Sequence, residues 1–272
     1  MADTPEALIR ARYGSLPVAP PPRLPDGLAA LLARSVTRRY TAEDVPDALL
    51  DTVLAGAQSA PAKSDLQQYS ILVARDAAKI AAVADAIGTM PWIKEAPVLL
   101  LFCGDMRRGR RICALHGRTH ANDSIDTFMN ASADAALAMG FCVMAADAAG
   151  LGTCPISYVR NSLDLITELF GLPAGVFPLA GLTLGWPAAR QAISPRLPPS
   201  VIVHRERYDD GALEAALPAY DKLRPPGKPR YPDVHGAKPE GCAWSENAAR
   251  QLSVPERANF RAWLAAKDIA LG

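Results

Sequence analysis

The spacing of apolar residues predicts that helices and strands alternate through the middle of the chain. Behind Pro46, the residues Leu50, Val53 and Ala57 recur at helical spacing and predict a helix that ends before Pro61. The same periodicity predicts further helices over 27–33, 76–87 and 162–170, and a short one over 5–13. Apolar segments over 69–74, 97–103 and 177–186 predict strands, and the continuous run 97–103 is typical of a strand buried on both faces.

The longest predicted helix, over 126–149, is apolar nearly all round and rich in alanine and glycine. A helix without a polar face has to be buried on every side. We therefore expect it to be the central helix of the domain or part of a subunit interface. Asn130, Asp134 and Asp147 lie within this stretch and argue against a membrane span.

Prolines divide the chain into three parts. Of 24 prolines, six fall in the first 25 residues and six between Pro218 and Pro239. We expect a proline-rich arm over 1–27, a folded domain over 28–210, and a linker with a helical extension over 211–272. In the extension, Ser253 and Glu256 form a possible capping box ahead of an apolar stripe at Phe260, Trp263 and Leu264. In the middle part, Asn161 is the expected cap of the helix over 162–170.

The charge balance excludes a bulk polyelectrolyte role. The chain has 29 basic and 28 acidic residues and a net charge of +1, so no global field attracts nucleic acid or anionic lipid. The start of the chain has no apolar signal region, and five scattered cysteines are typical of reduced thiols. We expect a cytoplasmic protein whose anion site, if it has one, is built from a few placed side chains.

Four segments carry groups suited to a bound ligand. Residues 34–38 (RSVTR) place two arginines four apart with hydroxyls between them, which suits a phosphate, although a solvated basic turn has the same composition. Residues 60–67 (APAKSDLQ) offer a lysine, a hydroxyl and an amide to the edge of a planar ring, or form an ordinary loop. Glycines at 150 and 152 open a third segment, and Arg196 lies between prolines in a fourth.

Taken in order, these segments resemble the FMN-dependent nitroreductase family, and in particular its NADPH-preferring, oxygen-insensitive group. The match is carried by RSVTRRYT (34–41), APAKSDLQ (60–67), GLGTCPI with the following VRN (150–161), and PLAGLTLGWP through PRLP (178–198). The resemblance implies an α+β, three-layer fold with a central, mainly antiparallel sheet flanked by helices. It also implies an intertwined homodimer in which two subunits share each FMN.

The resemblance further implies which residues hold the cofactor. Arg34, Ser35, Arg38 and Arg196 would bind the FMN phosphate and ribityl chain. The partner subunit would contribute Ala62, Lys63, Ser64 and Gln67 along the isoalloxazine edge, and Ile156 and Ser157 would lie against the ring. The chain departs from the family pattern at Val36, Asp65, Tyr158 and Ser194. Tyr158 is expected to narrow the cavity over the ring and so to contact the substrate.

Two further motifs have residue types that suit a bound ligand or metal. Arg107 and Arg108 belong to the densest basic run, which is either a solvated loop or a dock for the 2′-phosphate of NADPH. His116 and His120 have the spacing of metal ligands on a helix, but Gly117 lies between them and no glutamate follows His116. We interpret both as surface histidines and expect no metal site.

The expected function is an FMN-dependent NAD(P)H oxidoreductase. NADPH or NADH would give hydride to flavin N5 and leave, and a nitroaromatic or quinone-type acceptor would then take the electrons in a ping-pong cycle. The flavin carries this chemistry, so no catalytic side chain is assigned. The alternatives are a flavin enzyme of the same fold with other redox chemistry, such as a dehydrogenase or dehalogenase, and a non-catalytic flavin-binding module.

Overall fold

The computed structural model describes residues 4–189, 191–269 and 271, and their contacts divide the chain into two compact units. The sheet unit comprises Val36–Gln191 and Arg257–Gly272, and the arm unit comprises Met1–Ser35 and Ala192–Glu256. These units are defined by contacts in space. The three parts expected from proline content and family resemblance are defined along the sequence, and that division stays a prediction.

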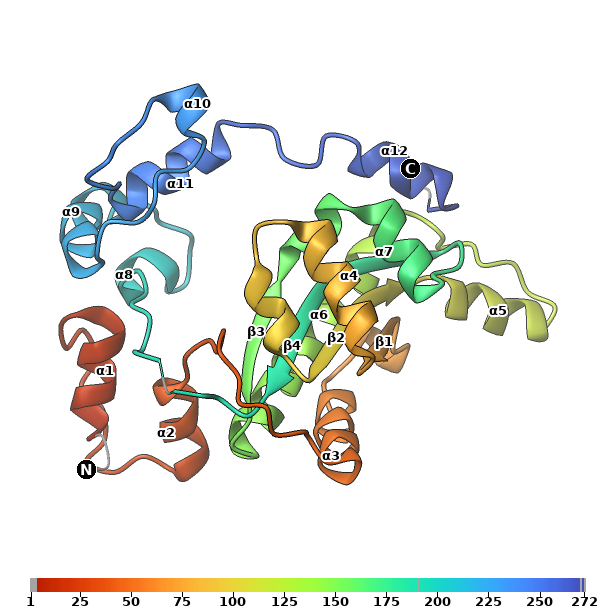
Figure 1. Cartoon of the computed structure of the whole chain (residues 1–272), viewed down its shortest axis with the longest axis horizontal. Coiled ribbons are helices and arrows are strands. Elements are labelled where there is room, and N and C mark those ends of the chain that lie inside the picture. The colour runs from red at the N-terminus through yellow and green to blue at the C-terminus, as the bar shows by residue number, and fades with distance from the viewer. Residues whose placement is uncertain (1–3, 190, 270, 272) are drawn as a thin grey trace. The chain divides into compact units, whose positions relative to one another are not determined.

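The sheet unit is built on four antiparallel strands in the order β1-β2-β4-β3 (Figure 1). They are β1 (Tyr69–Ala74), β2 (Val98–Asp105), β3 (Gly152–Ile156) and β4 (Val176–Gly185). Every residue of β2 is buried, as the continuous apolar run predicts for a strand covered on both faces. The short β3 was not expected as a strand. It lies at the edge of the sheet, where the missing N–H of Pro155 is tolerated.

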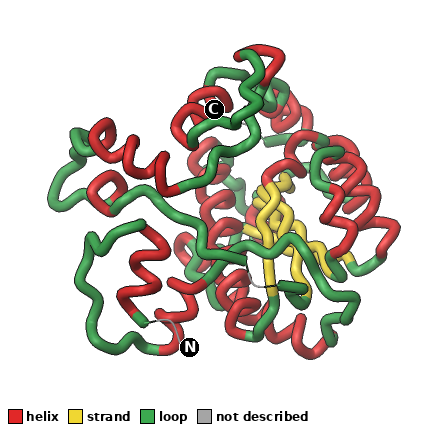
Figure 2. Tube along the Cα trace, turned by 60° about the vertical axis from the view of Figure 1, so that its left-hand side comes forward, coloured by secondary structure: helices red, strands yellow, loops and turns green. Residues whose placement is uncertain are grey.

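Helices cover both faces of the sheet and enclose a core on each. On one face, α3 (Asp47–Gln58) and the long α6 (Ile125–Ala148) pack on strand residues such as Leu100, Leu182 and Leu184. On the other, α4 (Ala77–Ile87) and α7 (Leu163–Phe170) pack on Leu99, Leu101 and Ile156. Figure 2 shows the strands between the two sets of helices. The predicted α+β, three-layer fold with an antiparallel sheet is confirmed.

Three short 3₁₀ turns and two further helices complete the sheet unit. The turns are η1 (Lys63–Asp65), η2 (Pro91–Glu95) and η3 (Ser157–Asn161), and the helices are α5 (Arg107–Leu115) and α12 (Phe260–Ala266). The expected stripe on α12 is confirmed, since Trp263 and Leu264 are buried in a third core with Phe177.

The expected capping residues are wrong at two places. Ser253 ends a helix, α11 (Trp244–Leu252), and α12 begins after Asn259. Ser162, not Asn161, occupies the cap position of α7, and Asn161 instead accepts a hydrogen bond from Arg257 Nε at 2.7 Å. In both cases a tertiary contact or a neighbouring element overrides the local cap signal.

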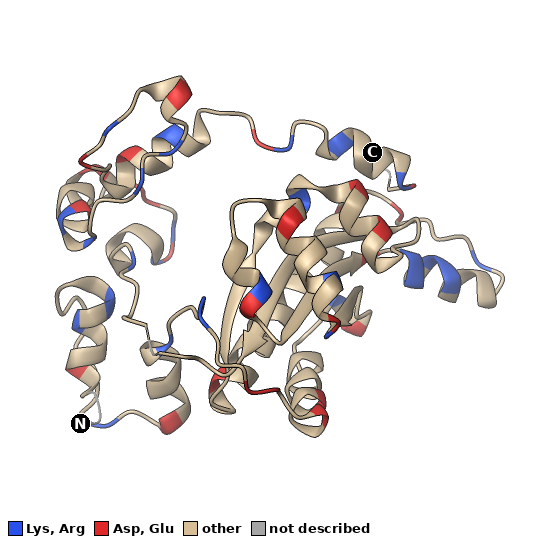
Figure 3. Cartoon of the chain, viewed as in Figure 1, with Lys and Arg blue, Asp and Glu red and all other residues tan. Residues whose placement is uncertain are grey.

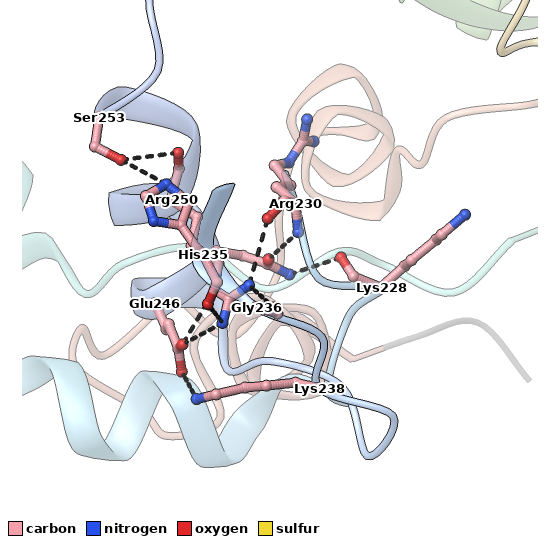
Figure 4. Close-up of polar contacts among 9 residues, drawn as sticks. Lys228, Arg230, His235, Gly236, Lys238, Glu246, Arg250 and Ser253 are labelled. Atoms are coloured by element: carbon pink, nitrogen blue, oxygen red, sulfur yellow. Dashed lines mark hydrogen bonds and ion pairs between the residues drawn. The ribbon is translucent and has the colours of Figure 1, made fainter. Parts of the chain in front are cut away.

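The arm unit consists of helices joined by loops. Its helices are α1 (Pro5–Tyr13), α2 (Asp26–Ala33), α8 (Pro199–Ile202), α9 (Leu213–Leu223), α10 (Pro232–His235) and α11. Three of them, α9, α10 and α11, lie within 211–272, where we expect a linker with a helical extension. The buried Arg250 donates to the carbonyl oxygens of Gly236 (2.9 Å) and His235 and pairs with Glu246, so that the chain around α10 is tied to α11 (Figure 4).

Candidate functional site

The predicted phosphate contacts of the arm unit are brought together around Arg12, which sequence reasoning missed. Arg34 follows the last residue of α2, and Arg196 lies in the loop before α8. The guanidinium of Arg12 donates to the carbonyl oxygens of Leu32 and Ser194, each at 2.8 Å, and of Arg34 at 3.1 Å. The Arg196 N–H donates back to the Arg12 carbonyl oxygen at 2.8 Å. Ser35 is half-buried next to Arg34.

The electrostatics of this cluster favour an anion. Burial lowers the pKa of the Arg12 guanidinium below its ordinary value, and the charges of Arg196 and Arg34 lower it further. The charges of Arg34 and Arg196 thus both lie within interaction range of the Arg12 guanidinium. Bidentate, always-charged donors in this arrangement suit a phosphate dianion, whose charge offsets their mutual repulsion.

Arg38 belongs to the sheet unit and takes its position from Thr37. The Thr37 N–H donates to the Thr153 carbonyl oxygen at 2.8 Å, and its carbonyl oxygen accepts from Tyr40 Oη at 2.9 Å. The Thr37 side chain lies against Gly152, where an added Cβ would be 2.2 Å from Thr37 Oγ1. The following Arg38 is exposed, with its guanidinium carbon 5.9 Å from the ring centre of Trp92.

The four predicted ring contacts, Ala62, Lys63, Ser64 and Gln67, lie together in the loop between α3 and β1, which we call the ring-edge loop (62–68). Ser64, Asp65 and Gln67 have φ values of +51°, +57° and +50°, a conformation that costs free energy in residues other than glycine. Such strain persists only where surrounding contacts hold the chain, and it is concentrated at functional sites.

Asp134 on α6 supplies one set of those contacts. Its side chain is 1% exposed, and its two carboxylate oxygens accept the N–H groups of Lys63 and Gln68, each at 2.9 Å. The carboxylate therefore holds both ends of the ring-edge loop. Its sequence signal was an acidic residue in the middle of a mostly apolar helix.

Arg108 holds the other side of the loop. It donates to the carbonyl oxygens of Gln67 and Tyr69, the latter at 2.8 Å, and to Ser70 Oγ at 2.9 Å. It also pairs with Asp105, whose Oδ1 accepts the Arg108 N–H at 2.9 Å and so caps α5. The basic run therefore forms a helix, as Figure 3 shows along α5, and not the solvated loop that was one of its two interpretations. Arg107 is exposed.

A cavity of about 540 Å³ lies beside the ring-edge loop. It is lined by Gln58, Asp65, Leu66, Gln67, Tyr69, Ser70, Ile71, Arg108 and Ile112. Polar groups of the loop thus face an open space within the sheet unit.

The glycine-led segment expected as a ligand loop forms β3 and then η3. Ile156 is 1% exposed and packs in the core under α4 and α7, so it can offer a ligand only its backbone. Ser157 is exposed, and Tyr158 is half-buried against the same core.

A second basic cavity lies in the arm unit, between Arg224 and Leu252 in the sequence. Its volume is about 770 Å³, and Arg224, Lys228 and Arg230 are among its lining residues. In Figure 4, the side chains of Lys228 and Arg230 extend away from the Arg250 cluster.

The two candidate metal ligands do not share a helix face. His116 ends α5, and His120 lies in the segment that follows. Among the described residues, no group of three or more His, Cys, Asp or Glu side chains is placed to hold a metal ion.

Comparison with known proteins places these features in a family. Residues 31–186 match the model of the Nitroreductase family, and residues 194–272 match the model of the Nitroreductase family, C-terminal domain. The chain is 37% identical over 188 residues to an FMN reductase [NAD(P)H] of Bacillus subtilis, which covers 68% of this chain and 76% of that protein. It is 32% identical over 220 residues to an oxygen-insensitive NADPH nitroreductase of Salmonella typhimurium, covering 81% and 88% of the two chains.

Solved structures agree with these matches. NfrA2 of B. megaterium superposes with a TM-score of 0.83 at 28% identity and covers 92% of this chain and all of its own. The NADPH:FMN oxidoreductase of Vibrio harveyi, in complex with NAD+, superposes with a TM-score of 0.77 at 26% identity and covers 89% and 98%.

Proposed function

The chain belongs to the nitroreductase family as an FMN-dependent NAD(P)H oxidoreductase, and from this premise we propose that it reduces nitroaromatic or quinone-type acceptors in a ping-pong cycle. The observation that carries the proposal is the convergence of Arg34 and Arg196 on Arg12, which suits the terminal phosphate of FMN. The strained, polar ring-edge loop suits the edge of the flavin ring.

When bound, FMN supplies a group that accepts hydride from NAD(P)H and donates electrons to the acceptor. The residues of the chain bind and orient it. In this proposal Arg34, Ser35, Arg38 and Arg196 hold the phosphate and ribityl chain. Ala62, Lys63, Ser64 and Gln67 border the ring, and Ile156 and Ser157 lie against it. Because Ile156 is buried, its part is played by the backbone, and Tyr158 limits the space for substrate.

The first test removes the predicted phosphate contacts. We expect the purified protein to bind FMN, and the Arg34→Ala, Arg38→Ala double variant to lose it on gel filtration. Wild-type protein that binds no FMN on reconstitution would contradict the function. A double variant that keeps its yellow colour would contradict the assignment of these two arginines.

For the hydride donor we propose a dock for the NADPH 2′-phosphate, with two candidate locations. One is the predicted pair Arg107 and Arg108, of which Arg108 is already bonded to the ring-edge loop. The other is the arm-unit cavity with Lys228 and Arg230. We would compare Arg107→Ala with the double variant Lys228→Ala, Arg230→Ala. The variant that raises KM for NADPH but not for NADH identifies the dock. If neither variant changes the KM for NADPH, both candidate locations are wrong.

We propose a homodimer on the evidence of α6. By length and composition this helix is apolar enough to cross a membrane, yet most of its buried residues belong to the core on the sheet. Its outer side exposes Ile125, Met129, Leu137 and Met144, and Gly140 lies among them with open space around it. An apolar stripe with small residues suits a second helix from a partner chain.

Light scattering tests this proposal. Wild-type protein is expected to have the mass of a dimer, and Met129→Arg that of a monomer. Leu252→Arg is a matched control, because Leu252 is 86% exposed on α11. A monomeric wild type, or a dimeric Met129→Arg variant, would contradict the interface.

The five cysteines, all of them thiols, support a reducing cytoplasmic location.

The two alternatives differ from the main proposal in turnover. A dehydrogenase or dehalogenase of the same fold would bind FMN but would not be reduced rapidly by NADPH. A flavin-binding module would show no turnover with a panel of nitroaromatic and quinone acceptors. Parallel lines in double-reciprocal plots of NADPH against acceptor are expected for the ping-pong cycle, and intersecting lines would contradict it.

A further inference from the structure

Arg12 lies in the amino-terminal arm, outside both matched family regions. The segment is nevertheless docked within the arm unit. Leu8 and Ile9 of α1 are buried. At the end of the helix, Gly14 has a φ of +72° and lies so close to Leu223 of α9 that an added Cβ would be 2.6 Å from Leu223 Cδ1. The arm is therefore an ordered part of this unit.

The Arg12 side chain joins two separate loops. It is 8% exposed, and its guanidinium donates to three backbone carbonyl oxygens, two at the end of α2 (Leu32 and Arg34) and one at Ser194. A planar guanidinium can serve such divergent acceptors at once, because its donors spread in a fixed fork. The same residue accepts the Arg196 N–H through its own carbonyl oxygen.

These contacts leave the loop before α8 little freedom. The carbonyl oxygen of Ser194 is held by Arg12, that of Pro195 accepts from Tyr220 Oη at 3.2 Å, and the N–H of Arg196 is held by Arg12. The Arg196 side chain itself is exposed, and its Nη1 donates to the carbonyl oxygens of Pro195 and Ser194 in its own loop, at 3.1 and 3.3 Å. The backbone is thus fixed while the charge remains available.

We propose that Arg12 is a positioning residue for the FMN phosphate, which rests on the proposed function. By bridging the two loops it sets the backbone of Arg34 and Arg196 so that their guanidinium groups converge on one phosphate, and its own charge adds to the field there. The amino-terminal arm is, on this account, part of the cofactor site.

The test compares binding of FMN with binding of riboflavin, which lacks the phosphate. Arg12→Met removes the charge and the three donors while keeping a good helix former in α1. We expect its dissociation constant for FMN to rise about 10- to 100-fold, because one or two charge-assisted contacts to the phosphate are lost. The dissociation constant for riboflavin should rise by less than about 3-fold. Arg10→Met is the matched control, because it removes the same charge from an exposed position of the same helix.

A second variant separates geometry from charge and guards against misfolding. Arg12→Lys keeps the charge but cannot span three divergent carbonyl oxygens, so we expect it to lose most of the preference for FMN over riboflavin. If Arg12→Met weakens the binding of FMN and of riboflavin equally, the role of Arg12 is merely structural and the proposal is overturned. The proposal is also overturned if Arg12→Lys binds both flavins like the wild type, or if Arg10→Met and Arg12→Met change the dissociation constant for FMN equally. If the wild type binds riboflavin and FMN equally, the phosphate site itself is wrong; if it binds neither, the proposed function fails.

Discussion

Replacing Asp134 by asparagine tests how the ring-edge loop is held in place. The carboxylate of Asp134 is the buried acceptor for the N–H groups of Lys63 and Gln68. Asparagine has nearly the same shape but only one oxygen, so its NH₂ group would face one of the two backbone donors. One charge-assisted hydrogen bond is lost, the other is weakened, and a buried donor is left without an acceptor.

The magnitude follows from two opposing quantities. Hydrogen bonds to a charged group contribute about 1.5–3 kcal/mol each, so the pair contributes about 3–6 kcal/mol. The left-handed conformations of Ser64, Asp65 and Gln67 cost of order 1–3 kcal/mol each. The loop is therefore near balance with Asp134 and unfavourable without it. We expect Asp134→Asn to lower the free energy of unfolding by about 2–4 kcal/mol and to open the loop locally.

Two measurements check this prediction. Urea unfolding gives the change in stability, and hydrogen–deuterium exchange of peptides spanning 60–70 reports whether the loop opens. Asp126→Asn is the control, since it removes an acidic group from an exposed position of the same helix and should change stability by less than about 1 kcal/mol. Unchanged exchange over 60–70, with a stability within about 0.5 kcal/mol of wild type, would refute the reasoning.

Three further predictions concern the rest of the chain. Burial raises the pKa of the Cys142 thiol to about 12, and that of Cys103 is raised for the same reason; Cys154 and Cys242 are buried as well, and Cys113 is half-buried. A thiol reagent at neutral pH should therefore react fast with Cys113 alone, and a fast phase that survives Cys113→Ser would contradict this. Hydrogen bonds from Lys238 and Arg250 hold the pKa of Glu246 below its ordinary value of 4.5. A depressed carboxyl pKa adds stability that is present above the pKa of the unfolded chain and is lost as pH falls through the pKa of the folded protein. Glu246→Gln should therefore melt at a lower temperature than wild type at pH 7, and the two melting temperatures should converge well below pH 4.5. A difference in melting temperature that stays constant with pH would contradict this prediction. Trp263→Ala should lower the free energy of unfolding by about 3–5 kcal/mol in urea, because the indole is buried in the third core; a loss below about 1 kcal/mol would show that α12 is not docked there.

Much of the fold follows from local pattern. Apolar periodicity predicted α3, α4, α6 and all of β1, because each of these elements packs one or both faces against the sheet and so carries the matching repeat. The edge strand β3 was not predicted, since its proline and flanking glycines are typical of a loop and only pairing with β4 makes it a strand. The helix α5 was missed because its apolar residues, such as Ile112 and Leu115, are exposed, so that no buried face marks it.

The candidate site also has parts that the sequence could indicate and parts that it could not. The segments around Arg34, Lys63 and Arg196 could be found by resemblance, because their residue types suit a phosphate and a ring edge. Their supports could not be found so readily. Asp134 acts on a loop about 70 residues earlier in the chain, and Arg12 acts on Ser194, more than 180 residues later. Such long-range contacts are produced by the tertiary fold and leave only a weak local signal in the sequence.

The central claim is that the chain binds FMN and passes electrons through it from NAD(P)H to an acceptor. The most direct measurement is the visible absorption spectrum of the purified, FMN-reconstituted protein, titrated with NADPH in the absence of oxygen. We predict one FMN per chain, rapid bleaching of its absorbance by about one equivalent of NADPH, and recovery of the oxidised spectrum when a nitroaromatic or quinone is added. A protein that binds no FMN, or a bound flavin that NADPH leaves oxidised, would contradict the account.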